Sequence, residues 1–200
     1  MKKLAVILLL SLSVFTSCNI LTNSSTDGVT TEDSNEAGGG STGYPYVWED
    51  LSWTVGETDI NTYSANTKIG RVTLYATSSA SIVVDANSKT IDDINFTHRC
   101  KLGGTGLLNT DDIETSYRVI AFPVIKNSQI KMYAQSASST SDRDLQISNL
   151  SGNYKITKTA LGANISCVID TFYTGDDTTL YLYSLNSGIN IYGIYVIKQK

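Results

Sequence analysis

The feature that most constrains the fold is a succession of short apolar runs that alternate with polar residues and end in Gly, Asn, Asp or Ser. The runs extend from Tyr44 to Lys200, and Thr, Val, Ile and Tyr dominate them. These residue types suit a pleated, half-buried surface, and helical periodicity is almost absent. We therefore expect strands at Val47–Val55, Arg71–Ala76, Ser81–Asp85, Asn95–Leu102, Tyr117–Val124, Gln129–Ser136, Asp144–Asn149, Asn153–Thr159, Ile165–Phe172, Thr179–Ser184 and Asn190–Lys198.

This many short strands joined by polar turns predict an all-β fold, a two-sheet antiparallel β-sandwich of jelly-roll type. The segment 44–200 is long enough to form one such domain around its own core. Asn186-Ser187-Gly188 reads as a tight turn into the last strand, and we expect Gly188 to adopt a positive φ there.

The first residues have the layout of a secretory signal. A charged start, Met1-Lys2-Lys3, precedes the apolar run Leu4–Phe15, and Thr16-Ser17 leads to Cys18. A cysteine at the cleavage point is the mark of a bacterial lipoprotein, so we predict a lipoprotein signal peptide at 1–17 and acylation, for example with palmitate, at Cys18; an ordinary signal peptide with an incidental cysteine is the alternative. The apolar run is about 12 residues long, too short to span a bilayer.

A polar spacer follows the expected lipid anchor. Residues 18–43 are rich in Ser, Thr and Gly, and their charged side chains are all acidic. Such a segment buries too little apolar surface to offset the entropy of ordering it, so we expect a disordered linker. These features predict a folded domain in the bacterial cell envelope, at the outer membrane or cell surface, whose only membrane contact is through lipid.

Two cations stand out in Phe96–Gly106, which reads FTHRCKLGGTG. Because side chains alternate along a strand, Arg99 and Lys101 should share one face and His98 and Cys100 the other. Neighbouring cations suit an anionic or hydroxyl-rich partner. The net charge of −4 argues against a general nucleic-acid binder, because that function requires a basic field.

Four blocks of the chain resemble the carbohydrate-binding β-sandwich modules appended to bacterial pectate lyases. They are FTHRCKLGGTG (96–106), YRVIAFPV (117–124), QIKMYAQSASSTSDRDLQISN (129–149) and TTLYLYSLNSGINIYGIYV (178–196), and VWEDLSW (47–53) suits the start of such a module. The resemblance implies that the domain binds polysaccharide, with pectin-like polyuronate a leading ligand. It also implies that Arg118 and Arg143 join Arg99 and Lys101 in one basic cluster; the alternative is that these cations pair with Asp residues at the sandwich edge.

Tyrosines could add a surface for sugars, because the ring is apolar and its tip is polar. Tyr133 and Tyr183 are the candidates we select for the ligand-binding surface, and Tyr181 and Tyr192 are further candidates. Ordinary strand residues half in the core are the alternative reading of all four.

Cysteines and acidic pairs give weaker signals. Cys100 and Cys167 both fall in expected strands and could form a disulfide in an exported protein, or could be buried free thiols. The pairs Asp92-Asp93, Asp111-Asp112 and Asp176-Asp177 could hold a structural calcium ion, although turns favour Asp in any case. We expect no other cofactor.

Catalysis is not expected. The single histidine, His98, should face away from Arg99, and no G-x-S-x-G nucleophile motif occurs. We therefore predict a non-enzymatic, lipid-anchored protein that binds polysaccharide or another glycan. The alternative is an adhesin or assembly subunit that binds an envelope protein, for example through an edge strand.

Overall fold

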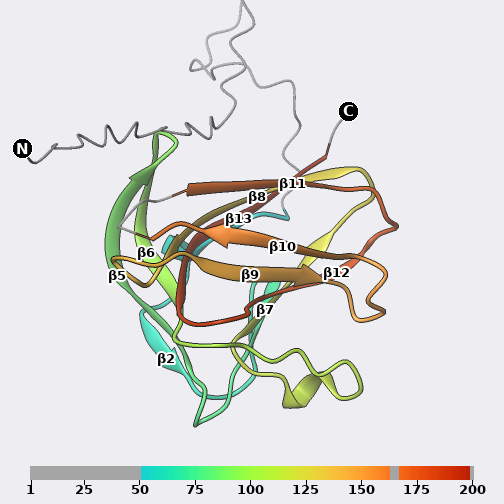
Figure 1. Ribbon diagram of the computed structural model, residues 1–200, viewed down its shortest axis with the longest axis horizontal. Coiled ribbons are helices and arrows are strands. Elements are labelled where there is room, and N and C mark those ends of the chain that lie inside the picture. The colour runs from blue at the N-terminus through green and yellow to red at the C-terminus, as the bar shows by residue number, and fades with distance from the viewer. Residues whose placement is uncertain (1–50, 163–166, 199–200) are drawn as a thin grey trace, which may run out of the picture. The chain divides into compact units, whose positions relative to one another are not determined.

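The computed structural model describes residues 51–162 and 167–198, and their strands pack as two antiparallel sheets (Figure 1). The predicted all-β sandwich of jelly-roll type is confirmed. The expected signal peptide, the lipidation site Cys18, the linker and residues 47–50 of the first expected strand lie outside the described residues. No helix among the described residues is long and apolar enough to cross a bilayer.

The first sheet, sheet A, has seven strands. In spatial order these are β11 (Cys167–Tyr173), β8 (Ser128–Ser136), β13 (Ile189–Lys198), β6 (Ile94–Leu102), β5 (Ile82–Ile91) and β2 (Asn61–Tyr63), with β1 (Trp53–Thr54) paired to β13.

The second sheet, sheet B, has six strands. In spatial order these are β10 (Lys155–Ala160), β9 (Arg143–Ser148), β12 (Thr178–Ser184), β7 (Val119–Val124), β4 (Val72–Tyr75) and β3 (Thr67–Ile69). Two short 3-10 turns, η1 (Val55–Glu57) and η2 (Ile113–Thr115), complete the described elements.

The core lies between the sheets and is built from alternate residues of each strand. Ile82 and Val84 of β5 and Leu180 and Leu182 of β12 are completely buried, and they belong to one continuous apolar cluster. Each such side chain contributes about 1.5–3 kcal/mol when it is fully removed from water. The period-two pattern in the sequence therefore supplies the inner face of both sheets.

The β5–β6 hairpin leaves sheet A part of the way along its length. β6 pairs with β13 only from Cys100 to Leu102, whereas β1 takes the neighbouring stretch of β13 at Ile194 and Gly193. The β5–β6 register also shifts between Ala86 and Lys89. As a result the hairpin curves along one side of the sandwich (Figure 1).

This curvature explains the main departures from the expected strands. β5 continues to Ile91, well beyond the expected end at Asp85, because its second half pairs with β6 outside the body of the sheet. Two short strands at the edges, β2 and β3, were not expected, because three residues are too few to show a periodic pattern. The expected positive φ at Gly188 was wrong: the described glycines with positive φ are Gly70 and Gly152.

Gly188 has a different reason to be glycine. A Cβ at this position would lie 3.2 Å from the Cβ of Ala137 and 3.3 Å from the carbonyl oxygen of Leu102. The position therefore requires a small residue for close packing rather than for backbone conformation.

Candidate functional site

Arg99 and Lys101 project from the outer face of sheet A, as alternation predicts, and both contact Asp85 on the neighbouring strand. The Arg99 Nε donates to Asp85 Oδ1 at 2.7 Å and Nη2 donates to Oδ2 at 3.2 Å, while Lys101 Nζ lies 3.3 Å from Oδ2. Hydrogen bonding from Arg99 lowers the pKa of Asp85 and raises the pKa of Arg99, so both groups stay ionised over a wide range of pH. The two cations share one carboxylate, which leaves net positive charge on this face.

Acid should weaken this cluster. Because the pKa of Asp85 is lowered in the folded protein, its stabilising contribution is complete above the unfolded value of about 4 and is lost as the pH falls through the lowered value. We expect urea unfolding at pH 7 and pH 3 to show a smaller acid loss in Asp85→Asn than in the native protein, by less than about 1 kcal/mol because the group is partly exposed. Asp176→Asn is the matched control, since the Asp176 side chain is 92% exposed; equal acid losses in all three proteins would contradict the role of Asp85.

Beside this ion pair lies a pocket of about 250 Å³, here called the sheet A pocket. Its lining is polar except for one alanine and comes from β5, β6, β8, β13 and the loop after β8. The residues are Asn87, Ser88, Lys89, Arg99, Gln135, Ser136, Ala137, Asn190 and Tyr192. Neighbouring strand positions thus bring together amides, hydroxyls and cations that are far apart in the sequence.

The Tyr192 hydroxyl orders the inner end of this pocket. It donates to Asn87 Oδ1 at 2.9 Å, lies 3.4 Å from Gln135 Oε1, and also interacts with the Arg99 side chain, which acts as the donor. Burial raises the pKa of Tyr192, so its hydroxyl remains protonated. Because the oxygen of the Asn87 amide accepts from Tyr192, its NH₂ group is left to donate elsewhere.

Asn190 contributes a side-chain amide to the lining of the pocket. The residue is 5% exposed and lies beside Lys101 on β6 and Gln135 on β8. Within the described part of the chain its side-chain amide makes no hydrogen bond, although it lines the pocket. Its nitrogen and oxygen are not among the buried, unpartnered side-chain atoms of the described residues, so the amide reaches the open pocket and is available to a ligand there.

The hairpin closes the outer face of sheet A next to the pocket. Phe96 packs against Tyr133 with ring centroids 5.1 Å apart and against Tyr192 at 5.9 Å. Tyr133 is 2% exposed and also meets Tyr195 edge-on at 5.2 Å. The expectation that Tyr133 presents its ring to a sugar is therefore wrong, because the hairpin covers it and makes it part of a second, smaller core.

Tyr183 lies on the other sheet, and Arg118 directly precedes its strand β7. Tyr183 is on the outer face of sheet B, where Leu108 and Ile113 of the segment 103–118 pack over the same apolar cluster. Arg118 Nη1 lies 3.4 Å from the carbonyl oxygen of Thr105, and its Nε is buried without a partner among the described residues.

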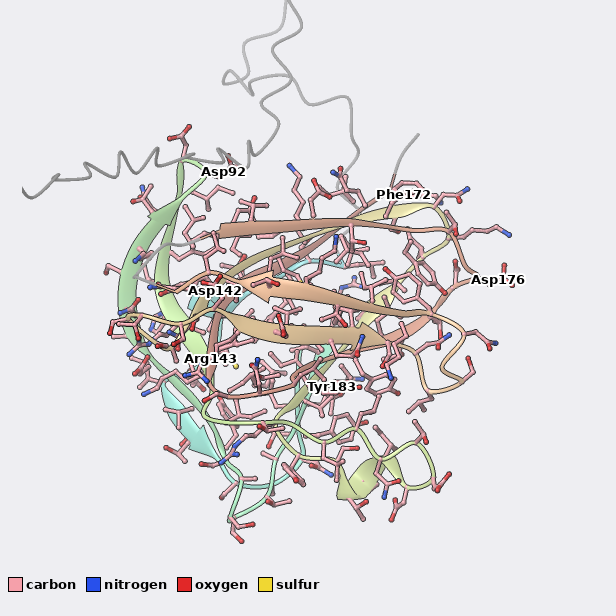
Figure 2. The ribbon with its side chains drawn as sticks, in the orientation of Figure 1. Asp92, Asp142, Arg143, Phe172, Asp176 and Tyr183 are labelled. Atoms are coloured by element: carbon pink, nitrogen blue, oxygen red, sulfur yellow. The ribbon has the colours of Figure 1, made fainter. Side chains whose placement is uncertain are left out.

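Arg143 stands apart as well. It is the first residue of β9 on sheet B, and its Nε is likewise buried without a described partner. Figure 2 shows Arg143 and Tyr183 at separate places on the sandwich. Of the four cations predicted to form one cluster, Arg99 and Lys101 come from one face of β6, whereas Arg118 directly precedes β7 and Arg143 begins β9 of sheet B, so strand pairing does not make the four neighbours.

The Cys100–Cys167 disulfide is not formed. Cys100 is a free, fully buried thiol whose pKa is raised by burial. The register aligns Cys100 with Ile191, Ile191 with Ala134 and Ala134 with Cys167. The two cysteines therefore lie three strands apart, or roughly 14 Å at about 4.8 Å per strand, whereas a disulfide needs Cα atoms within about 7 Å.

The described residues hold no group of three or more His, Cys, Asp or Glu side chains that could bind a metal ion. Asp92 and Asp93 instead form the tip of the β5–β6 hairpin, both with positive φ. His98 Nδ1 lies 2.8 Å from the hydroxyl of its neighbour Thr97.

Sequence reasoning missed Asn87, Gln135 and Asn190. A signal was present for Asn190, an amide inside the largely apolar strand β13, because Asn is depleted in strands. Gln135 carried none, since β8 has several other polar residues. Asn87 carried no such signal, because it lies in the hairpin segment that was expected to be a turn.

No protein-family model matches the chain, and no curated protein matches it. Several solved β-sandwiches are similar in fold. The CBM22-1 xylan-binding domain of Paenibacillus barcinonensis Xyn10C has 13% identity and a TM-score of 0.44, over 75% of this chain and 95% of that one. The CBM35 from Cellvibrio japonicus Abf62 has 12% identity and a TM-score of 0.39, over 75% and 95%.

A carbohydrate binding module (CBM6cm-2) from Cellvibrio mixtus lichenase 5A, in complex with cellotriose, has 12% identity and a TM-score of 0.37, over 70% of this chain and 98% of that one. At these values the similarities do not extend to a site, and a function has to rest on the residues of this chain.

Proposed function

We propose that this chain binds carbohydrate through the sheet A pocket, with an acidic, carboxylate-bearing polysaccharide as the preferred ligand. The observation that carries the proposal is the Asn190 amide, which faces the pocket without a hydrogen-bond partner in the described chain. A hydroxyl-bearing ligand that pairs with this amide would gain a hydrogen bond, with a net contribution of about 0.5–1.5 kcal/mol.

The lining suits a sugar for a chemical reason. An amide offers both a donor and an acceptor, so it can pair with a hydroxyl in either role. Asn87, Gln135 and Asn190 bring three amides to one pocket, and Ser88 and Ser136 add hydroxyls. A ligand with many adjacent hydroxyls fits this set better than a purely apolar one.

The charged side chains around the sheet A pocket add a preference for an acidic ligand. Arg99 lines the pocket and Lys101 lies beside it, and both contact the single carboxylate of Asp85. Two cations that share one carboxylate favour a further carboxylate on the ligand, and Arg99 is already held in place by its ion pair and by Tyr192. An ordered guanidinium loses less conformational entropy on binding than a mobile one.

The proposed position of the domain is the bacterial envelope, at the outer membrane or cell surface, through acylation of Cys18. A lipid anchor would place many copies side by side, so that weak single contacts add up on a polymeric ligand. We expect a single site to bind in the range of about 1 mM to 1 µM.

Asn190→Ala tests the proposal. We expect it to weaken binding of polygalacturonate about 10-fold or more in calorimetric titration, because the ligand loses a desolvated hydrogen bond. Thermal stability should stay the same or rise, since the lost amide has no partner within the described chain. Raised salt should also weaken polygalacturonate binding in the native protein.

Asn61→Ala is the matched control, because Asn61 is exposed on the edge strand β2 and does not line the pocket. Equal affinity of the native protein and Asn190→Ala would contradict the pocket assignment. Binding of neutral galactan as strongly as polygalacturonate, with no effect of salt, would contradict the acidic preference alone.

A further inference from the structure

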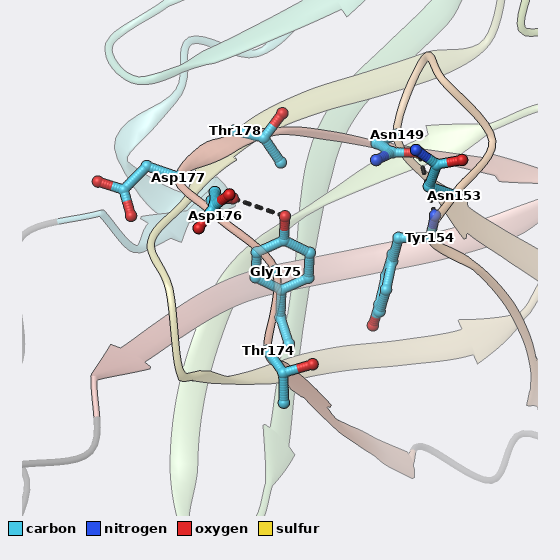
Figure 3. A pocket seen from close by; sticks show the side chains of 9 residues that line it. Asn149, Asn153, Tyr154, Thr174, Gly175, Asp176, Asp177 and Thr178 are labelled. Carbon is cyan, nitrogen blue, oxygen red and sulfur yellow. Dashed lines mark hydrogen bonds between the residues drawn. The ribbon is translucent and has the colours of Figure 1, made fainter.

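A second pocket, of about 390 Å³, lies between two turns at one end of the sandwich (Figure 3). The β9–β10 turn supplies Asn149, Asn153 and Tyr154, and the β11–β12 turn supplies residues 173–178. Tyr173 pairs with Ser128 at one end of β8, and the sheet A pocket lies at Ser136, the other end. Eight residues of strand separate the two, roughly 27 Å at about 3.4 Å per residue.

We propose that this end pocket is a second binding site, which takes an uncharged, hydroxyl-rich ligand of the class of a neutral sugar residue. Its volume falls within the range of small-molecule pockets, about 300–1,000 Å³. The assignment is independent of the first pocket, because the two share no residue.

Two tyrosines form one wall of the end pocket. The Tyr154 and Tyr173 rings meet edge-on, with centroids 5.0 Å apart and planes at 82°. Tyr173 is fixed, since its hydroxyl donates to the carbonyl oxygen of Asp176 at 2.6 Å and a Cβ on Gly175 would lie 2.5 Å from that hydroxyl. Tyr173 is 3% exposed and supports the ring of Tyr154 from behind, whereas Tyr154 is partly exposed, so the apolar surface available to the C–H face of a sugar is that of Tyr154.

Polar groups with open hydrogen-bonding capacity surround this wall. Asn149 Oδ1 accepts from the backbone N–H of Tyr154 at 3.2 Å, which leaves the Asn149 NH₂ group as a donor. The side chains of Asn153, Thr174 and Thr178 line the pocket and make no hydrogen bond to another described residue. Donors and acceptors are therefore both present, as hydroxyl recognition requires.

The charge of the end pocket is opposite to that of the sheet A pocket. Lys126 Nζ contacts Asp176 Oδ1 at 3.0 Å and the Lys126 backbone N–H donates to Asp177 Oδ1 at 2.8 Å. Each carboxylate keeps a second oxygen that can accept from a hydroxyl. Two carboxylates against one lysine disfavour an anionic ligand, so the two pockets select different sugars.

A calcium ion fits the end pocket less well than a sugar. Calcium takes about 6–8 oxygen ligands, and the described residues bring together no group of three or more acidic, histidine or cysteine side chains. The aromatic wall would also serve no purpose in a metal site.

Two sites on one rigid body would let the protein hold two glycan segments at once, an acidic one and a neutral one. Simultaneous engagement raises the effective affinity for a mixed polymer without any new contact.

The test is a titration of the ¹⁵N-labelled protein, followed by NMR, with neutral hexasaccharides of glucose, xylose and galactose. We expect at least one of them to shift the amide signals of residues 149–154 and 174–178. Asn153→Ala should weaken that binding about 5- to 20-fold, because it removes one of the polar groups without touching the core. Asn61→Ala is the matched control. Asn190→Ala should leave the affinity of the neutral hexasaccharide for residues 149–154 and 174–178 unchanged.

Three results would overturn the second site: no shift at these residues with any of the hexasaccharides, unchanged affinity in Asn153→Ala, or the same shifts with calcium chloride alone and none with sugar. Neutral-sugar shifts confined to the neighbourhood of Gln135 and Asn190, and lost in Asn190→Ala, would also overturn it while supporting the sheet A pocket. Failure of polygalacturonate binding alone bears only on the first proposal.

Discussion

Phe96→Ala should lower the free energy of unfolding by about 3–5 kcal/mol, the range for removal of a large aromatic side chain from a core. Phe96 is 2% exposed and contacts both Tyr133 and Tyr192, and Ile91 and Ile94 belong to the same small core. The substitution leaves a cavity beneath the β5–β6 hairpin, in the small core that Phe96 forms with Ile91, Tyr133 and Tyr192. Urea unfolding, followed by tyrosine and tryptophan fluorescence, measures the loss.

The same substitution should weaken glycan binding, because the β5–β6 hairpin carries both Asn87 and Arg99 into the sheet A pocket. Phe172→Ala is the matched control: Phe172 is 45% exposed on β11 and should cost less than about 1 kcal/mol. A loss of less than about 1 kcal/mol in Phe96→Ala as well would show that the hairpin does not depend on this small core.

Gly106→Ala should destabilise the protein by about 1–3 kcal/mol, the usual cost of forcing extra atoms into a packed site. A Cβ at Gly106 would lie 2.7 Å from the carbonyl oxygen of Arg118 and 2.8 Å from the Cβ of Tyr183. Neither atom can rotate away, so the backbone must move. This shift should disturb the hydrogen bond that the Gly106 N–H donates to the carbonyl oxygen of Ser184 at 2.8 Å.

Gly103→Ala provides the comparison, because a Cβ there would meet nothing within 4 Å and the residue does not need a positive φ. We expect its unfolding midpoint in urea to match that of the native protein within error. An unchanged unfolding midpoint in Gly106→Ala would contradict this prediction. It would show that the segment 103–118 can shift to accommodate a Cβ despite its packing against sheet B.

The expected strands were largely recovered because their period of two is a local property. Tyr117–Val124 and Thr179–Ser184, for example, lie within one or two residues of β7 and β12. Boundaries failed where pairing leaves the sheet, as on β5. Edge strands of three residues left no pattern to find.

The candidate site was only partly visible in advance. Arg99 and Lys101 were placed on one face correctly, because side chains two positions apart in a strand point to the same side of the sheet. Their shared partner Asp85 and the Tyr192 hydroxyl, which contacts Arg99, come from other strands, so a local sequence pattern does not predict these contacts. Arg118 and Arg143 were grouped with them by family resemblance, and the sheet pairing separates them.

The sequence by itself determined that this chain forms two-faced strands and which residues along each strand share a face. Only the tertiary structure decided which strands are neighbours, and hence that Asn87 and Gln135 meet Tyr192, 105 and 57 positions away in sequence. It also decided that the hairpin covers Tyr133 while Asn190 stays open to a pocket. The physical reason is that alternation is fixed by backbone geometry within a strand, whereas strand order and hairpin curvature arise from packing among distant residues.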